Sequence, residues 1–178
     1  MPRKQVPNAA LGAEEAAGVM GVHYTQPGKK VQKGLLSCRY VTCNEAEDRA
    51  FAVYSLKECE EDFADYEETY KAGKGRPRTK VEDREYVLKR LLSEKNLIDY
   101  DDAISVAEAA EILGMVRSGV QYLLAQEKIV ARKIWGERSN AANFWIVSRK
   151  SCEQHAAATA KLEKAGKKAG RPRTGTNI

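Results

Sequence analysis

Residues 104–114 read Ile-Ser-Val-Ala-Glu-Ala-Ala-Glu-Ile-Leu-Gly and are typical of a short helix with both ends marked. Ser105 is a good N-cap, and Glu108, three residues later, completes a capping box. Apolar residues recur at helical spacing through the segment, and Gly114 stands where a helix ends in a left-handed turn. The segment therefore predicts one helix that begins after Ser105 and stops at Gly114.

The residues that follow predict a second helix, a hairpin and a third helix. Ser118 can cap a second helix, which is expected to run through about Gln126. Two runs rich in β-branched and aromatic residues, 130–135 and 143–147, flank a turn-rich tip and predict a hairpin. A third helix is expected from Ser148 onward. Helix, short turn, helix, hairpin and helix is the element order of a winged helix-turn-helix domain.

The same pattern occurs twice in the chain. A shift of 93 positions aligns residues 11–60 with residues 104–153 without a gap, and ten of the 50 pairs are identical, more than unrelated sequences share. The identical pairs include Glu15 with Glu108, Arg39 with Arg132, Phe51 with Phe144, and Cys59 with Cys152. Repetition of this length indicates a repeated structural block. A block of about 60 residues buries only a thin core, so each copy is expected to need the other copy or a partner.

These patterns predict an α+β chain of two small winged helix-turn-helix domains joined by a helical linker. The expected parts are a first winged domain at 8–70, a basic segment with a linker helix at 71–98, a second winged domain at 99–165 and a basic tail at 166–178. The linker helix, expected over Thr79–Ile98, has an apolar face. Packing on the second winged domain is its favoured role, and a dimer seam is the alternative.

The second copy resembles the excisionase/MerR-type DNA-binding domain, and phage small terminase subunits carry a related module. The resemblance rests on residues 105–114, 117–120 and 131–133 together with the order of the elements. It extends to the first copy only through the repeat. It implies that the second helix of each copy enters the major groove of double-stranded DNA, and that the hairpin contacts the flanking backbone.

Carried onto this chain, the resemblance assigns DNA contacts to particular side chains. The groove-facing residues are Arg117, Ser118, Gln121 and Tyr122 in the second copy and Tyr24, Thr25, Gln26, Lys29 and Lys30 in the first. The wing and backbone contacts are Arg132, Lys133, Arg138 and Arg39. Arginine and glutamine can read base edges with paired hydrogen bonds, while hydroxyls and cations suit phosphates. The alternative is that these are ordinary solvated side chains.

The first copy departs from the pattern in two places. Pro27 is tolerable only in the first turn of the second helix, after Thr25 or Gln26 as the cap. The expected wing tip, residues 42–48, holds three acidic side chains, which would repel phosphate. The first copy is therefore either a weaker DNA reader or a surface for another protein.

Each copy is followed by the same pentapeptide, Gly-Arg-Pro-Arg-Thr, at 75–79 and at 170–174. The pentapeptide resembles the AT-hook, which implies contact with the minor groove of A·T-rich DNA. Proline keeps such a segment extended, glycine permits close approach, and the arginines favour the negative potential of a narrow groove. The residues concerned are Lys74, Gly75, Arg76, Pro77 and Arg78, and Gly170, Arg171, Pro172 and Arg173. A flexible, solubilising linker and tail is the alternative.

Composition is compatible with a cytosolic nucleic-acid-binding chain. The net charge is +5, which is compatible with binding to DNA. The sequence contains no apolar run long enough to cross a bilayer, and its start lacks an apolar signal core. A cytosolic location with reduced thiols is therefore expected, and the family resemblance implies the bacterial cytosol or nucleoid.

Catalysis and metal binding are not expected. The two histidines lie at unrelated points of the repeat, and neither a nucleophile triad nor a phosphate-binding glycine loop is apparent. Zinc bound by Cys38, Cys43, Cys59 and His23 is an alternative with loose spacing. A small buried residue where the third helix meets the sheet explains the matching Cys59 and Cys152 more economically. The sequence thus predicts no enzyme, no metal and no cofactor.

The expected function is binding of double-stranded DNA as a regulator or architectural factor, and the family resemblance implies that the factor belongs to a phage or other mobile element. The alternative is an adaptor whose acidic first domain binds a protein while the second tethers the pair to DNA, for example a DNA-packaging recognition subunit. A homodimer is left open.

Overall fold

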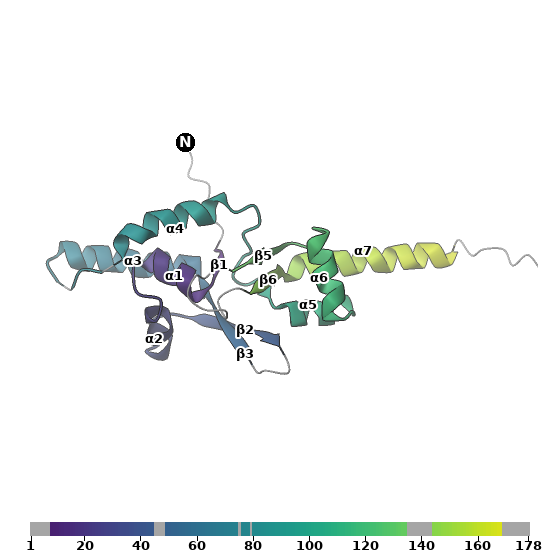
Figure 1. The fold of residues 1–178 in the computed structure, drawn as a ribbon, viewed down its shortest axis with the longest axis horizontal. Helices are drawn as coiled ribbons and strands as arrows, with labels where there is room; N and C mark the ends of the chain where they lie inside the picture. Colours follow the sequence, from purple (N-terminus) through teal and green to yellow (C-terminus); the bar gives the residue numbers. More distant parts are fainter. Residues whose placement is uncertain (1–7, 45–48, 75, 79, 135–143, 169–178) are drawn as a thin grey trace, which may run out of the picture.

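The chain is a mixed α+β protein, as predicted. A computed structural model describes residues 8–44, 49–74, 76–78, 80–134 and 144–168. Within these ranges it contains seven helices and two three-stranded antiparallel sheets (Figure 1). No helix in the described ranges combines the length and the hydrophobicity needed to span a bilayer.

Two sets of elements follow one another with the same order and the same spacing. The first repeat consists of β1 (Ala10–Leu11), α1 (Ala13–Met20), α2 (Gln26–Gln32), β2 (Cys38–Asn44), β3 (Arg49–Ser55) and α3 (Leu56–Lys71). The second repeat consists of β4 (Ala103–Ile104), α5 (Val106–Leu113), α6 (Arg117–Ala125), β5 (Ala131–Lys133), β6 (Trp145–Ser148) and α7 (Arg149–Lys168). The strand orders, β1-β3-β2 and β4-β6-β5, are equivalent.

The start and the end of α5 follow directly from its sequence. The Ser105 hydroxyl accepts a hydrogen bond from the Glu108 amide at 3.0 Å, and the Glu108 carboxylate accepts one from the Ser105 amide at 2.8 Å. This is the predicted capping box. At the other end Gly114 adopts φ 62°, a left-handed conformation that favours glycine, and Gly21 does the same at the end of α1 with φ 65°.

Each sheet packs on its own helices with one face and on the other repeat with the opposite face. The register is the same in both sheets: Arg39 lies opposite Val53, and Arg132 lies opposite Ile146. A buried cluster between the repeats is built from equivalent residues, namely Ala10 and Ala103, Val41 and Ile134, and Val53 and Ile146, with Ile98 and Phe144. The rings of Phe51 and Phe144, also equivalent, stack with centroids 4.5 Å apart. The two repeats therefore share a core.

The linker helix α4 (Val81–Ser93) packs on the first repeat, whereas the sequence favoured the second. Val87 and Leu91 belong to the buried cluster of the first repeat, and α4 lies alongside α1 (Figure 1). The close approach depends on Gly18, because a Cβ atom there would lie 2.6 Å from a methyl of Val87. The second-repeat counterpart of Gly18 is Glu111, so a side chain occupies the position that glycine leaves free for Val87 in the first repeat.

Candidate nucleic-acid interface

Helix α6 places a polar face in solvent and an apolar face in the core. Val120 and Leu123 are buried against α5 and the second sheet. Ser118, Gln121 and Tyr122 are exposed, with Tyr122 at 61%. Helical periodicity explains the division, because the buried residues are three apart and the exposed ones lie between and around them. Three of the four predicted groove residues of this copy are thus brought to one accessible surface.

The fourth predicted groove residue, Arg117, is partly buried. It stands at the first position of α6, and together with Ser118 it lines the groove between α5 and α6. An anion that approached the free backbone amides at the N-terminus of α6 would also lie near the positive charge of Arg117. Arg117 is therefore adjacent to the exposed face of α6 rather than at its centre.

Helix α2 offers fewer accessible cations than the sequence suggested. Thr25 is its N-cap and Pro27 lies in the first turn, as the proline requires. Lys29 is exposed, but Lys30 forms an ion pair and hydrogen bond with Asp62 of α3. The Lys30 ammonium is consequently occupied within the first repeat, which contradicts its assignment to the DNA groove.

The remaining α2 candidates lie near its N-terminus. Tyr24 is 43% exposed and tilts against the His23 ring, with centroids 4.4 Å apart. The exposed Thr25 hydroxyl is 3.1 Å from His23 Nδ1. Gln26 is partly buried. These side chains form a small polar surface of modest extent.

Arg132 is a buried structural residue, and its assignment to the wing is wrong. Only 3% of it is exposed. Its Nε lies 2.5 Å from Glu94, which caps α4, its Nη1 donates to the Ala10 carbonyl at 2.6 Å, and its Nη2 pairs with the buried Glu15 of α1. Glu15 also accepts the Gly12 amide at 2.9 Å. One guanidinium thus joins both repeats and the linker.

Arg39, the counterpart of Arg132, also reaches toward the chain segment that joins the repeats. Its Nη1 donates to the Tyr100 carbonyl at 2.7 Å, and the side chain is partly buried. Each arginine of this pair therefore makes a structural contact outside its own repeat. The sequence contained a signal for the structural role of Arg132, because its partner Glu15 also belongs to an identical pair of the repeat. Of the other wing candidates, Lys133 is exposed and Arg138 lies outside the described residues.

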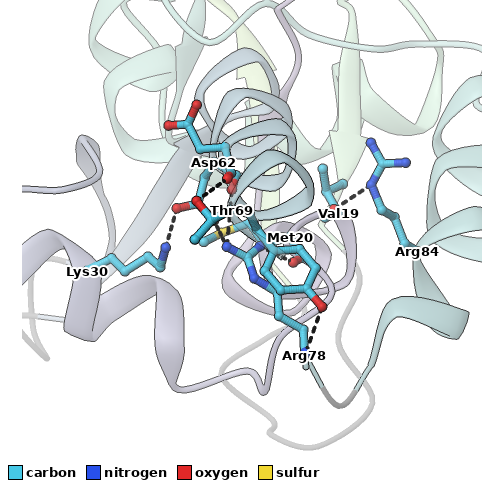
Figure 2. Close-up of polar contacts among 9 residues, drawn as sticks. Val19, Met20, Lys30, Asp62, Thr69, Arg78 and Arg84 are labelled. Atoms are coloured by element: carbon cyan, nitrogen blue, oxygen red, sulfur yellow. Dashed lines mark hydrogen bonds and ion pairs between the residues drawn. The ribbon is translucent and has the colours of Figure 1, made fainter. Parts of the chain in front are cut away.

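The first Gly-Arg-Pro-Arg segment is docked on the first repeat through Arg78 (Figure 2). Its Nη1 donates to the Met20 carbonyl at 2.6 Å, and its Nη2 lies 2.9 Å from Asp62. The guanidinium also stands 4.3 Å from the centroid of the Tyr66 ring, whose hydroxyl accepts the Arg78 amide at 3.0 Å. Arg78 is therefore a clamp between α1 and α3, which contradicts its assignment to the minor groove.

The other members of the two segments are placed differently. Lys74, Arg76 and Pro77 are exposed. Gly75 and the second segment, Gly170, Arg171, Pro172 and Arg173, lie outside the described residues. Arg76 is thus the one arginine of the described segment that is open to solvent.

Arg78→Ala should lower the free energy of unfolding by about 2 kcal/mol, because it removes several hydrogen bonds to a charged donor in a largely buried site. Arg76→Ala, two residues away and exposed, should change it by less than about 0.5 kcal/mol. Urea unfolding followed by far-UV circular dichroism gives both values. Equal losses for the two variants would contradict the clamp.

Cys59 and Cys152 are small buried core residues, as predicted. Both are fully buried at equivalent positions of the third helix of each repeat. Burial raises the pKa of the Cys152 thiol to about 11 and also raises the pKa of the Cys59 thiol, with further contributions from nearby carboxylates. Both thiols are protonated at neutral pH and are poor nucleophiles. Among the described residues no three histidine, cysteine or acidic side chains form a metal-binding group.

Comparison of the chain with protein-family models, with curated proteins and with solved structures finds no match. The assignment of a function therefore depends on the geometry described above.

Proposed function

We propose that this chain binds double-stranded DNA through two winged helix-turn-helix domains, with α6 of the second repeat in the major groove. The observation that carries the proposal is the exposed face of α6. Helix α6 follows a short turn after α5 and presents Ser118, Gln121 and Tyr122 to solvent. Val120 and Leu123 fix its opposite face in the core. A rigidly held helix with a polar outer face is what groove entry requires.

The chemistry of this surface suits nucleic acid. The Gln121 amide can pair with an adenine edge through two hydrogen bonds. The Ser118 and Tyr122 hydroxyls are suitable phosphate donors, and the exposed Lys133 on β5 adds charge that neutralises the backbone without reading sequence. In this proposal Arg76, Arg171 and Arg173 contact A·T-rich minor groove next to the main site. The chain has no catalytic role in it.

In this proposal the first repeat contributes less to DNA binding than the second. This difference favours, as a second candidate, an adaptor whose first repeat binds another protein. Lys30 and Arg78 are tied to Asp62, and Arg39 contacts the linker between the repeats. Helix α3 carries seven acidic and two basic side chains, a net charge of −5. Such a surface repels phosphate and suits a basic protein partner. A regulator of a mobile element and a DNA-packaging recognition subunit are both consistent with that division of roles.

A matched pair of substitutions separates the two candidates. Tyr122 and Lys29 are equivalent residues of α6 and α2, and both are exposed. Tyr122→Ala should weaken binding on the order of tenfold, since loss of one good DNA contact costs about 1–3 kcal/mol. The measurement is fluorescence anisotropy of labelled random-sequence and A·T-rich duplexes with the full chain across a salt series. The full chain is needed because the two repeats share a core.

The result for Lys29→Ala distinguishes two modes of binding. A comparable loss with a shallower salt slope indicates that both repeats contact DNA. An unchanged affinity indicates that the second repeat alone binds DNA, as in the adaptor. If neither substitution alters the affinity for any duplex, the proposal is wrong.

A further inference from the structure

A small pocket lies where the linker between the repeats meets the end of α6 and the edge of the second sheet. Its volume is about 290 Å³. Apolar side chains, among them Leu124, Val130 and Trp145, form one part of its lining, and the charged Lys95 and Glu127 belong to the other part. The volume is near the lower end of the range of ligand sites, so the pocket suits a small molecule.

Two residues of this lining replace smaller residues of the first repeat. The 93-position shift relates Trp145 to Ala52 and Glu127 to Gly34. Trp145 is 43% exposed, so part of its ring is accessible to a ligand. At these two positions the second repeat therefore has an aromatic ring and a carboxylate where the first repeat has neither.

Glu127 has a backbone conformation that favours glycine. It follows the C-cap of α6 with φ 50°, and among the described residues it is the one non-glycine residue with a positive φ. The Glu127 amide donates to the Leu124 carbonyl at 3.1 Å, in a helix end that requires a left-handed residue. Gly34 meets the same requirement after α2 with φ 68°. A glutamate in this strained position beside a pocket indicates a function of its side chain.

Opposite charges and backbone polar groups lie together at this pocket. Lys95 Nζ is 3.7 Å from Glu127 Oε2, and the side chains are 85% and 83% exposed. An ion pair this exposed contributes little to stability, so either member can exchange its partner. The edge strand β5 adds the N–H and C=O of Ala131, which point away from β6 because the neighbouring Val130 accepts the ladder hydrogen bond from Ser148.

We propose that this pocket binds a free α-amino acid with an apolar side chain. The α-carboxylate of the ligand pairs with Lys95 and its α-ammonium pairs with Glu127. Both ligand groups are bonded to one carbon atom, and they therefore match two opposite charges that lie 3.7 Å apart. The ligand side chain packs against Trp145 and Leu124, where an unpaired charge would be costly. The inference does not depend on DNA binding.

Isothermal titration calorimetry of the full chain with L-leucine and L-phenylalanine tests the proposal. Both should bind with dissociation constants below about 1 mM. In a Trp135→Phe variant Trp145 is the remaining tryptophan, and its emission should change with the same midpoint. L-Aspartate and L-lysine should bind at least about tenfold more weakly, because their side chains carry a charge.

N-acetyl-L-leucine amide distinguishes an amino acid from a peptide strand, because it has the apolar side chain and neither charge. It should bind at least about tenfold more weakly than L-leucine. Equal binding would show that the edge of β5 takes an extended peptide, and would overturn the proposal. Absence of both heat and an emission change with L-leucine and L-phenylalanine would also overturn it.

Glu127→Gly separates a role in binding from a role in folding. It should weaken binding of L-leucine about fivefold or more, while the melting temperature stays unchanged or rises, because glycine adopts the left-handed conformation without strain. Trp145→Ala, which introduces the residue of the first repeat, should weaken binding about tenfold or more.

Lys128→Ala is the matched control for Lys95→Ala, since both lysines are exposed and Lys128 is outside the pocket lining. Lys95→Ala should weaken binding of L-leucine about fivefold, and Lys128→Ala should leave it unchanged. Equal affinities of Lys95→Ala, Glu127→Gly and the unsubstituted chain would contradict the proposed site. Far-UV circular dichroism verifies that each variant is folded.

Discussion

Glu15→Gln should lower the free energy of unfolding by about 2–3 kcal/mol, because the buried Arg132 guanidinium loses its buried anionic partner and keeps only the partly exposed Glu94. Glu15 and Arg132 are 1% and 3% exposed, and the pair links α1 of the first repeat to β5 of the second. Urea unfolding followed by far-UV circular dichroism measures the loss.

The repeat supplies a matched control for this substitution. Glu108 is the counterpart of Glu15, and its side chain is 41% exposed at a distance of 4.0 Å from Arg149. Glu108→Gln should cost less than about 1 kcal/mol, the usual range for exposed ion pairs. Equal losses for Glu15→Gln and Glu108→Gln would contradict this role of Arg132.

Phe144→Ala should lower the free energy of unfolding by about 3 kcal/mol, since it opens a cavity in the core that the two repeats share. Phe144 is 8% exposed and stacks on Phe51. Tyr40→Ala is the control, because Tyr40 is an aromatic residue on β2 that is 67% exposed, and its loss should cost less than about 1 kcal/mol.

The shared core also predicts that both repeats unfold together. The two tryptophans, at positions 135 and 145, belong to the second repeat, so fluorescence reports on that repeat, whereas far-UV circular dichroism reports on both. The two signals should give one coincident transition. Two separate transitions would show that the repeats are independent domains.

Local features of the fold could be read from the sequence because short-range chemistry determines them. The capping box at Ser105 and the glycine at position 114 mark the ends of α5 wherever α5 is placed. The 93-position repeat extended these assignments to the first copy, down to the burial of Cys59 and Cys152.

Contacts between segments that are distant in the sequence could not be read in this way. Arg132 and Ile134 alternate onto one face of the hairpin, but a sequence does not say that another sheet covers that face. An arginine in an expected wing is most simply interpreted as a phosphate ligand. Arg78 was misplaced for the same reason, since its partners Met20 and Asp62 lie in two different helices.

The docking of α4 also depended on information outside the helix. Its apolar face was visible in the sequence, whereas the surface that receives it was not. Gly18 determines that surface, because only glycine allows Val87 to approach α1 so closely. A glycine within a predicted helix, where it weakens helix formation, is the signal that could have identified the receiving face.

Photo-crosslinking from α6 tests the proposed DNA interface most directly. A photoreactive phenylalanine analogue replaces Tyr122 of the full chain or, as the control, Tyr86 of α4; the two side chains are 61% and 62% exposed. After irradiation with a labelled duplex, we predict a crosslink from position 122 and none from position 86. A crosslink from position 86 alone, or none from position 122 under conditions where the duplex is bound, would show that α6 does not face DNA.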